Sequence, residues 1–388
     1  MTVSRKTYLD YAATTPVDPE VIRAMEPYYN QKYGNTMSIH AFGQRQSEAV
    51  EKARRVIARS LEALPEEIIF TASATESNNL AIKGMAFANQ KKGKHLIIST
   101  IEHDCVMESA KWLRNLGWKI SWLAVDGEGV VDTDQLKREI SIETFLVSVI
   151  HGNNEMGTVQ NIREIGAICK ERGVRFHTDA AQSFGPVKID VNQMNLDALT
   201  ISSHKIYGPK GAAVLYLKKG TKIEPWLHGG GQENGLRSST VNVPAIVGLA
   251  KAVEIVQKTR DKENRKLAKL RDYFIKEVLG LIEGTSLNGH PTERLPNNIN
   301  ISFANIEGES LLMELDRRGV EVSTGSACSS RSLEPSHVLM AMGLGEKAAH
   351  GSIRFSLGRW TTKAELDYVI KVLPPIVYKL RKISPFKS

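Results

Sequence analysis

The sequence predicts an α/β fold in which helices cover a mostly parallel sheet, together with a smaller α+β domain. Two observations predict it: short apolar runs alternate with stretches of helical periodicity, and this alternation stops after about residue 260. The apolar runs are residues 68–70, 96–98, 120–124, 145–149, 174–176 and 199–201. Each is short enough to be a buried strand of a sheet that is covered on both faces.

Helical periodicity fills several of the intervals, at residues 81–88, 106–116 and 162–171. Helix start signals elsewhere in the chain support the alternation of strands and helices. Asp18 before Pro19 is typical of an N-cap with a first-turn proline. Asp132, three residues before Gln135, is typical of a capping box. We therefore expect a helix to begin at each of these two places.

The last third of the chain predicts a different architecture. A long charged helix is expected from Val243 towards Leu279. Short strands and helices are then expected at residues 299–303, 310–318, 321–323, 353–356 and 362–381. Because a domain usually has ~100–200 residues, a chain of 388 residues favours two domains. We predict a large domain over residues 15–260 and a small domain formed by residues 1–14 and 261–388.

The composition is that of a globular enzyme, with 41% hydrophobic and 24% charged residues. No apolar run approaches the ~18–20 residues of a membrane span, and the N-terminal residues lack the apolar segment of a secretory signal. The net charge is +8, but the basic residues are scattered, so we expect no direct nucleic-acid binding. Three cysteines without a C-x-x-C pair argue against disulfides and structural zinc, and favour a cytoplasmic location.

Polar clusters follow five of the apolar runs. They are residues 71–76, His103, residues 151–155, residues 179–182 and residues 202–205. In open α/β sheets, ligands bind beyond the carboxyl ends of the strands. The clusters therefore predict a ligand site at that edge of the sheet.

Lys205 and Asp179 favour an aldehyde cofactor with a pyridine ring. A lysine fixed after a strand can form a Schiff base with such a cofactor, although a lone lysine there is more often solvated. Asp179 follows an earlier strand and would keep the pyridine nitrogen protonated, whereas alone it would be a turn or a helix cap. Gln182 could then bind the phenolic oxygen of the ring.

Two further clusters each have two interpretations. Residues 73–76 follow a strand and open a helix, which predicts either a phosphate site or a plain N-cap. His103 either caps a helix or makes a core hydrogen bond, or it lies on the cofactor ring and transfers protons near neutral pH. The cofactor lysine favours the functional interpretation of both.

The ordered set of motifs resembles the group I cysteine desulfurases of the IscS/NifS type, which are fold-type-I (aminotransferase-like) enzymes dependent on pyridoxal 5′-phosphate. The motifs are residues 8–16 (YLDYAATTP), 74–78 (ATESN), 102–103 (EH), 153–155 (NNE), 177–182 (HTDAAQ), 202–211 (SSHKIYGPKG), 237–240 (RSST), 323–328 (STGSAC) and 352–359 (SIRFSLGR). They extend over nearly the whole chain. The resemblance implies conversion of L-cysteine to L-alanine, with sulfur passed on for iron–sulfur cluster assembly and tRNA thiolation.

The resemblance also implies a role for each cofactor residue. Lys205 would hold the cofactor covalently, His103 would stack on its ring and transfer protons, and Asp179 would pair with the pyridine nitrogen. The other cofactor contacts would come from Ala74, Thr75, Asn154, Gln182, Ser202, His204 and, from a second subunit, Thr240. The chain is therefore expected to form a homodimer.

Arg354 would bind the carboxylate of the substrate, with help from Asn35 and Asn154. A planar guanidinium suits this role because it binds a carboxylate through two parallel hydrogen bonds. A surface ion pair is the alternative for Arg354. The chain departs from the family pattern at Thr36, where proline is usual, so we expect a less rigid loop beside Asn35.

Cys328 lies in a small, polar segment over residues 324–332, which is typical of a surface loop. Cys105 and Cys169 lie in helical patterns beside apolar neighbours, and we interpret both as buried, inert thiols. The resemblance implies that Cys328 attacks the substrate sulfur and carries the persulfide to an iron–sulfur scaffold protein or another acceptor. It also implies that Cys328 can ligate a transient iron–sulfur cluster shared with the scaffold.

Other functions on the same fold are a selenocysteine lyase, a transaminase, and a non-catalytic delivery protein. Transamination would not need Cys328, and a selenocysteine lyase could keep its activity without it. Lys205 argues against a non-catalytic role, because such a protein has no use for a cofactor lysine.

Overall fold

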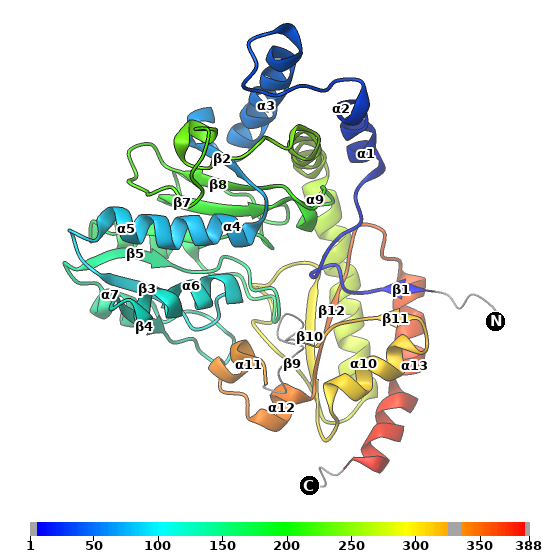
Figure 1. The fold of residues 1–388 in the computed structure, drawn as a ribbon. Helices are drawn as coiled ribbons and strands as arrows, with labels where there is room; N and C mark the ends of the chain where they lie inside the picture. Colours follow the sequence, from blue (N-terminus) through cyan, green and yellow to red (C-terminus); the bar gives the residue numbers. More distant parts are fainter. Residues whose placement is uncertain (1–5, 325–334, 385–388) are drawn as a thin grey trace.

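The computed structural model describes residues 6–324 and 335–384. A seven-stranded sheet forms the centre of its larger part (Figure 1). In spatial order the strands are β2 (Ile68–Thr71), β8 (Ala213–Leu217), β7 (Ala198–Ser202), β6 (Arg175–Asp179), β5 (Thr144–Ser148), β3 (His95–Ser99) and β4 (Lys119–Leu123). β8 runs antiparallel to both neighbours, and the other neighbouring pairs are parallel. The mostly parallel sheet is confirmed, and each predicted apolar run falls on one of its strands.

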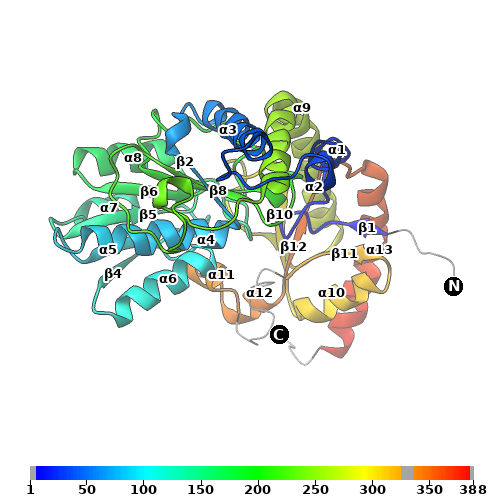
Figure 2. The same ribbon diagram turned by 45° about the horizontal axis from the view of Figure 1, so that its top comes forward.

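Helices cover both faces of this sheet (Figure 2). One face carries α4 (Ala74–Asn79), the π-helical turn η2 (Leu80–Gly84), α5 (Met85–Asn89) and α6 (Asp104–Asn115). The other carries α1 (Pro19–Met25), α3 (Ala41–Ser60), α7 (Thr133–Glu139), α8 (Ile162–Glu171) and the first half of α9 (Val243–Leu281). On β3, Ile97 packs into one core, while Leu96 and Ile98 pack into the other, because successive side chains of a strand point to opposite faces. The apolar runs are therefore buried on both sides.

The predicted helix starts are found, with one difference. Asp18 caps α1 by accepting a hydrogen bond from the backbone of Glu20, and Asp132 caps α7 by accepting from the backbone of Gln135. The side chain of Gln135 accepts from the backbone of Ala124 instead of from Asp132. The cap of α7 therefore forms without the reciprocal half of a capping box, because Gln135 anchors the end of β4.

The smaller part has the predicted α+β composition and its own core. A three-stranded antiparallel sheet has the order β12 (Ser352–Ser356), β10 (Asn298–Phe303), β9 (Thr285–Leu287), and β1 (Thr7–Tyr8) pairs with β11 (Val320–Glu321). Its longer helices are α10 (Gly308–Asp316), α13 (Lys363–Ile383) and the second half of α9. The shorter elements of the chain are α2 (Pro27–Asn30), η1 (Pro65–Glu67), η3 (Ser203–Lys205), η4 (Glu233–Gly235), α11 (His337–Ala341) and α12 (Glu346–His350). Phe274 of α9 and Phe355 of β12 pack together at the centre of this core, with ring centroids 5.0 Å apart.

α9 joins the two parts as one continuous helix of 39 residues (Figure 1). Its residues up to Val256 pack against the large sheet, and those from Leu267 onward pack in the smaller core. The predicted boundary at residue 260 thus falls between the two cores but inside an unbroken helix, and the domain limits stay a prediction.

Arg359 ties the smaller part to the larger one. Its guanidinium pairs with Asp18, at the start of α1, and lies 2.8 Å from Glu263 of α9. It also lies over the ring of Tyr207, 4.2 Å from the centroid. These contacts fix the two parts against each other beside the end of β7.

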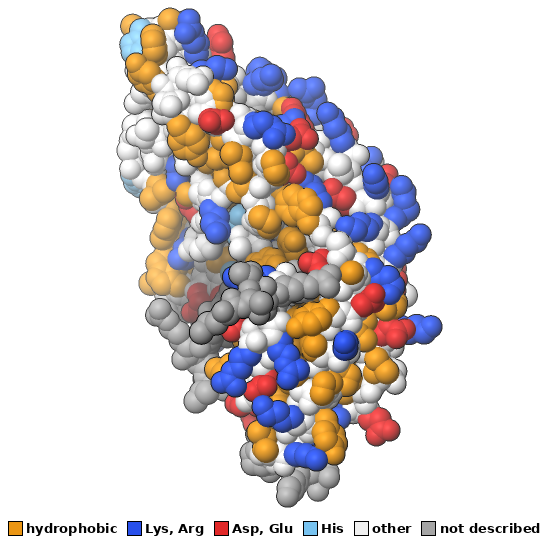
Figure 3. All heavy atoms as spheres, turned by 90° about the vertical axis from the view of Figure 1, so that its right-hand side faces the viewer, with side chains coloured by type: hydrophobic (Ala, Val, Ile, Leu, Met, Phe, Trp, Pro, Cys, Tyr) orange, Lys and Arg blue, Asp and Glu red, His pale blue; other side chains and the backbone are white. Residues whose placement is uncertain are grey.

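Basic side chains on the face drawn in Figure 3 extend from one end of the molecule to the other and are interspersed with Asp and Glu. Every helix in residues 6–324 and 335–384 is too short or too polar to cross a membrane.

Candidate active site

A cavity of about 360 Å³ lies at the carboxyl ends of the parallel strands. The predicted residues that line it are Ala74, Thr75, His103, Asn154, Asp179, Gln182, Ser202, His204, Lys205 and Arg354. Most of them follow β2, β3, β5, β6 and β7, whose carboxyl ends share one edge of the sheet. Ala12, Ala13 and Arg354 close the cavity from the side of the smaller part.

Lys205 lies in η3, directly after β7. Its amine donates hydrogen bonds to the carbonyl oxygens of Ala12 and, at 2.8 Å, Ala13. The N-terminal segment therefore passes beside the lysine. Gln182 donates to the same Ala12 carbonyl at 2.8 Å, so the two predicted cofactor residues share one anchor.

Asp179 ends β6 and is only 4% exposed. One carboxylate oxygen accepts from the backbone N–H of Ala181 at 2.8 Å, and the other accepts from the side-chain amide of Asn78 at 2.6 Å. These two donors fix the orientation of a buried carboxyl group. An acceptor held in this way is what a protonated pyridine nitrogen requires.

His103 caps α6, and its ring lines the cavity. Nδ1 accepts from the backbone N–H of Cys105 at 3.2 Å and lies 3.1 Å from Cys105 Sγ. Because Nδ1 accepts a hydrogen bond, the neutral ring carries its proton on Nε2. The capping interpretation of His103 is thus confirmed, and its ring also lines the cavity.

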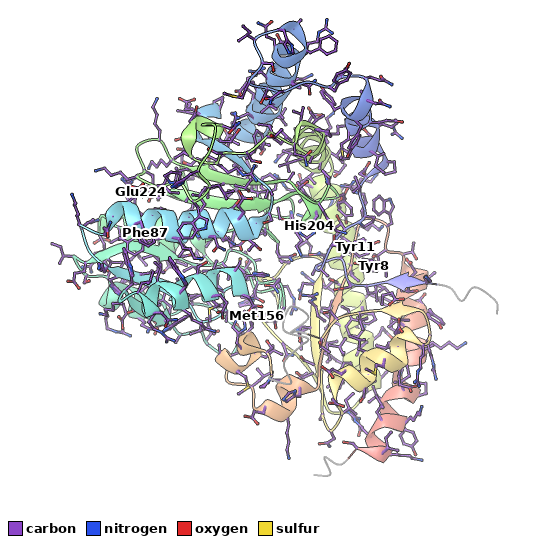
Figure 4. The ribbon with its side chains drawn as sticks, viewed as in Figure 1. Tyr8, Tyr11, Phe87, Met156, His204 and Glu224 are labelled. Atoms are coloured by element: carbon purple, nitrogen blue, oxygen red, sulfur yellow. The ribbon has the colours of Figure 1, made fainter. Side chains whose placement is uncertain are left out.

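Hydroxyl and imidazole groups also line the cavity. They belong to Ser73, Thr75, Ser202 and His204. Ser73 also caps α4 by accepting from the backbone of Glu76, so the N-cap interpretation is confirmed. His204 Nδ1 lies 3.1 Å from Thr14 Oγ1, and Figure 4 shows the ring near the N-terminal segment with Tyr11. Burial, together with the nearby Lys205 charge, lowers the pKa of His204 to about 4, so its ring is neutral.

Arg354 reaches the cavity from β12 and is buried, with 4% of its side chain exposed. Its guanidinium lies 2.8 Å from Asp10 and donates to the carbonyl of Asn154 at 3.1 Å. Nε is buried and has no hydrogen-bond partner among the described residues. Arg354 thus forms an ion pair, as the alternative interpretation expects, but the pair is buried and does not lie at the surface.

Two buried carboxyl groups, for which the sequence predicted no role, also line the cavity. Burial raises the pKa of Glu102 to about 8 and that of Glu155 to about 7. Ser336 donates to Glu155, and His337 Nε2 donates to the carbonyl of Glu102 at 2.9 Å. The start of α11 is therefore fixed at the cavity wall. In the sequence, the only signal for Glu102 and Glu155 was that they adjoin His103 and Asn154.

Two predicted residues within the described part of the chain do not line the cavity. Asn35 is exposed, and its side chain accepts from the backbone of Met37 at 2.9 Å. Thr240 is exposed in the segment before α9. Cys328 lies outside the described residues, so its roles as nucleophile and as cluster ligand stay predictions.

The interpretation of the two other cysteines is half right. Cys169 is buried at 1% exposure, and burial raises the pKa of its thiol to about 12, which confirms an inert core residue. Cys105 was interpreted in the same way, and this is wrong. It lies in the first turn of α6, only partly buried, and lines the cavity beside His103. The sequence predicted that Cys105 lies near a helix, but not that the first turn of this helix faces the cavity.

The donor set fits pyridoxal 5′-phosphate. An amine, a buried carboxylate, an imidazole and several hydroxyl groups line one cavity. Arg354 adds an unsatisfied buried N–H, which suits the carboxylate of an amino acid. The fold and this donor set are those expected of an aminotransferase-like enzyme.

Comparisons with known proteins agree with that class. Residues 7–369 match the family model described as Aminotransferase class-V. A cysteine desulfurase IscS from Dictyoglomus turgidum is 53% identical over 386 residues, which cover 100% of this chain and 98% of the relative. Among solved structures, a NifS-like protein has a TM-score of 0.92 at 38% identity and covers 97% of this chain and 100% of its own. A structure described as SspA in complex with cysteine has a TM-score of 0.81 at 38% identity, with 92% and 100% covered.

The chain belongs to the class-V aminotransferase family. Within that family, it is a member of the cysteine desulfurases of the IscS type.

We predict that the buried Glu102 makes stability depend on pH. Its pKa is raised to about 8 in the folded chain, against an ordinary value of 4.5. The folded chain then holds one proton more than the unfolded chain between these values, so the free energy of unfolding falls as the pH rises through this window. Glu102→Gln mimics the protonated acid. Its stability relative to wild type should grow by up to about 1.4 kcal/mol per pH unit between about pH 6 and 8.

Urea unfolding at several pH values measures this difference. Glu108→Gln is the matched control, because Glu108 lies exposed on α6. Parallel pH profiles for wild type and Glu102→Gln would show that Glu102 is ionised in the folded chain.

Proposed function

We propose that the protein is a pyridoxal-phosphate-dependent cysteine desulfurase, which converts L-cysteine to L-alanine and carries the sulfur as a persulfide on Cys328. The observation that supports it most is the convergence of Lys205, Asp179 and His103 on one cavity that also receives Arg354. The names of the relatives favour cysteine as the substrate, since one is a cysteine desulfurase and another was solved in complex with cysteine.

The larger part of the chain would hold the cofactor. Lys205 would anchor it covalently, and Asp179 would keep its pyridine nitrogen protonated. The remaining contacts would come from Ala74, Thr75, Asn154, Gln182, Ser202 and His204. When bound, the cofactor supplies an electron sink for bond changes at Cα and Cβ of the amino acid.

Arg354 would bind and orient the substrate. Its unsatisfied Nε–H faces a buried environment, where a charge-assisted hydrogen bond to a carboxylate is strong. Asp10 and the Asn154 carbonyl hold the guanidinium in place. Lys205 or His103 would then move the Cα proton, because both line the same cavity.

Sulfur transfer would be the work of Cys328. Its thiolate attacks the substrate sulfur, and an S–S bond forms while the Cβ–S bond breaks. The electron pair stays with the substrate, Cβ takes up a proton, and alanine leaves. Cysteine and the enzyme thiol thus become alanine and an enzyme persulfide, with no external oxidant. An iron–sulfur scaffold protein or a tRNA-thiolation protein would accept the outer sulfur.

The described residues on either side of residues 325–334 support the assignment of Cys328 to this cavity. Ser323 exchanges backbone hydrogen bonds with Arg354, at 2.7 and 3.2 Å. Ser336, on the other side, donates to Glu155 in the cavity wall. Both connections of the segment that carries Cys328 are therefore anchored at substrate-binding or cavity residues.

Selenocysteine cleavage and transamination remain the alternatives, and the named relatives do not favour them. We also propose a homodimer, because the exposed Thr240 would have a role only if it completed the phosphate site of a second subunit.

The first experiment measures alanine and sulfide from L-cysteine with a thiol reductant. We expect equal amounts from wild type and a loss of at least about 100-fold in Cys328→Ala, because the acceptor thiol is gone while the cofactor absorbance is kept. Cys169→Ala is the matched control and should keep both products. Equal activity of wild type and Cys328→Ala would contradict the desulfurase mechanism and favour a lyase.

The dimer is tested by complementation between two inactive chains. Lys205→Ala and Thr240→Val are each expressed alone and then together with two affinity tags. If Thr240 acts in the partner's site, the mixed dimer regains one complete site, which holds Lys205 of one chain and Thr240 of the other. We expect up to about half the wild-type activity per dimer, since one of two sites is intact. A mixed dimer no more active than its parents would contradict the shared site.

A further inference from the structure

A hydrogen-bonded series of side chains connects Asp179 to His103 at the cavity wall. Asn78 Nδ2 lies 2.6 Å from Asp179 Oδ2 and 3.1 Å from Cys105 Sγ. The same sulfur lies 3.1 Å from His103 Nδ1. This hydrogen-bonded series therefore connects the end of β6, the buried face of α4 and the first turn of α6.

The direction of each hydrogen bond follows from the groups involved. The amide nitrogen of Asn78 can only donate, so it gives one hydrogen to Asp179 and the other to the sulfur. The opposite amide orientation would place an oxygen against the carboxylate, so it is excluded. Nδ1 of His103 already accepts from the Cys105 backbone, which leaves the thiol to donate its S–H to Nδ1.

We propose that Asn78 and Cys105 are positioning residues that couple the Asp179 carboxylate to the His103 ring through this one hydrogen-bonded chain. The thiol is suited to the link because it accepts from Asn78 and donates to His103 at the same time. Asn78 is fully buried, so its amide has no water to replace either partner. A change at the carboxylate is then felt at the imidazole without direct contact between them.

The consequence concerns the proposed reaction, on which this inference rests. His103 would transfer a proton while Asp179 would hold the pyridine nitrogen. A shared link orients both groups, so that the ring keeps its Nε2–H form and its place on the cavity wall. Losing the link should slow the reaction and leave substrate binding, which falls to Arg354, nearly unchanged.

The test is a double-mutant cycle read by nitrogen-15 NMR of histidine-labelled full-length protein with its cofactor. His103→Gln assigns the ring signals. We expect Cys105→Ala to shift the Nδ1 signal of His103, and Cys105→Ser, which keeps a donor and an acceptor, to restore it. Asn78→Ala should shift the same signal in the wild-type background and have no effect in the Cys105→Ala background. Cys169→Ala should leave it unchanged.

Kinetics supply the second readout. Cys105→Ala should lower kcat about threefold to tenfold, the effect of one lost hydrogen bond, with KM changed less than about twofold. Cys105→Ser should stay close to wild type in both.

The proposal is overturned if Asn78→Ala shifts the His103 signal equally in both backgrounds, or if Cys105→Ala shifts it not at all. If neither the wild-type protein nor any variant forms alanine from L-cysteine, the proposed function is wrong. The NMR double-mutant cycle still shows in that case whether Asn78 and Cys105 couple Asp179 to His103.

Discussion

The parallel order of β3, β5, β6 and β7 is the constraint on which the site depends. Parallel strands place their carboxyl ends along one edge, so the residues that follow them meet although they are far apart in sequence. His103, Asp179 and Lys205 come from three different strand ends and reach one cavity for this reason. Burial at that edge removes water, which makes each remaining hydrogen bond decisive for orientation.

The smaller part of the structure supplies the remaining wall of the cavity that lies at the edge of the large sheet. Arg354 is held by β12, and Ala12 and Ala13 bring backbone carbonyls to Lys205. The N-terminal segment pairs with β12 at Asp10, so Arg354 and the backbone carbonyls that contact Lys205 belong to one structural unit. Arg359 fixes this unit against α1 and α9. The proposed substrate arginine and the proposed cofactor lysine are therefore both held by contacts with residues 10–13.

Much of the sheet and of the cavity lining could be predicted from the sequence, since six of its seven strands appear as apolar runs and polar residues follow five of these runs. β8 was not foreseen, because only its long-range pairing with β2 and β7 distinguishes it from any other apolar run. The role of Cys105 was missed because periodicity places a residue on a helix but does not say what the first turn faces. The places proposed for Thr240 and Asn35 depend on a second chain or on a bound ligand, which one sequence does not contain.

We propose that Lys205 binds an aldehyde cofactor beside Asp179 and His103. Borohydride reduction of the purified protein makes such a link permanent, and peptide mass mapping then locates it. We expect one phosphopyridoxyl adduct, on Lys205, and none in Lys205→Ala. An adduct on another lysine, or no adduct in protein that shows the cofactor absorbance, would show that Lys205 does not anchor the cofactor.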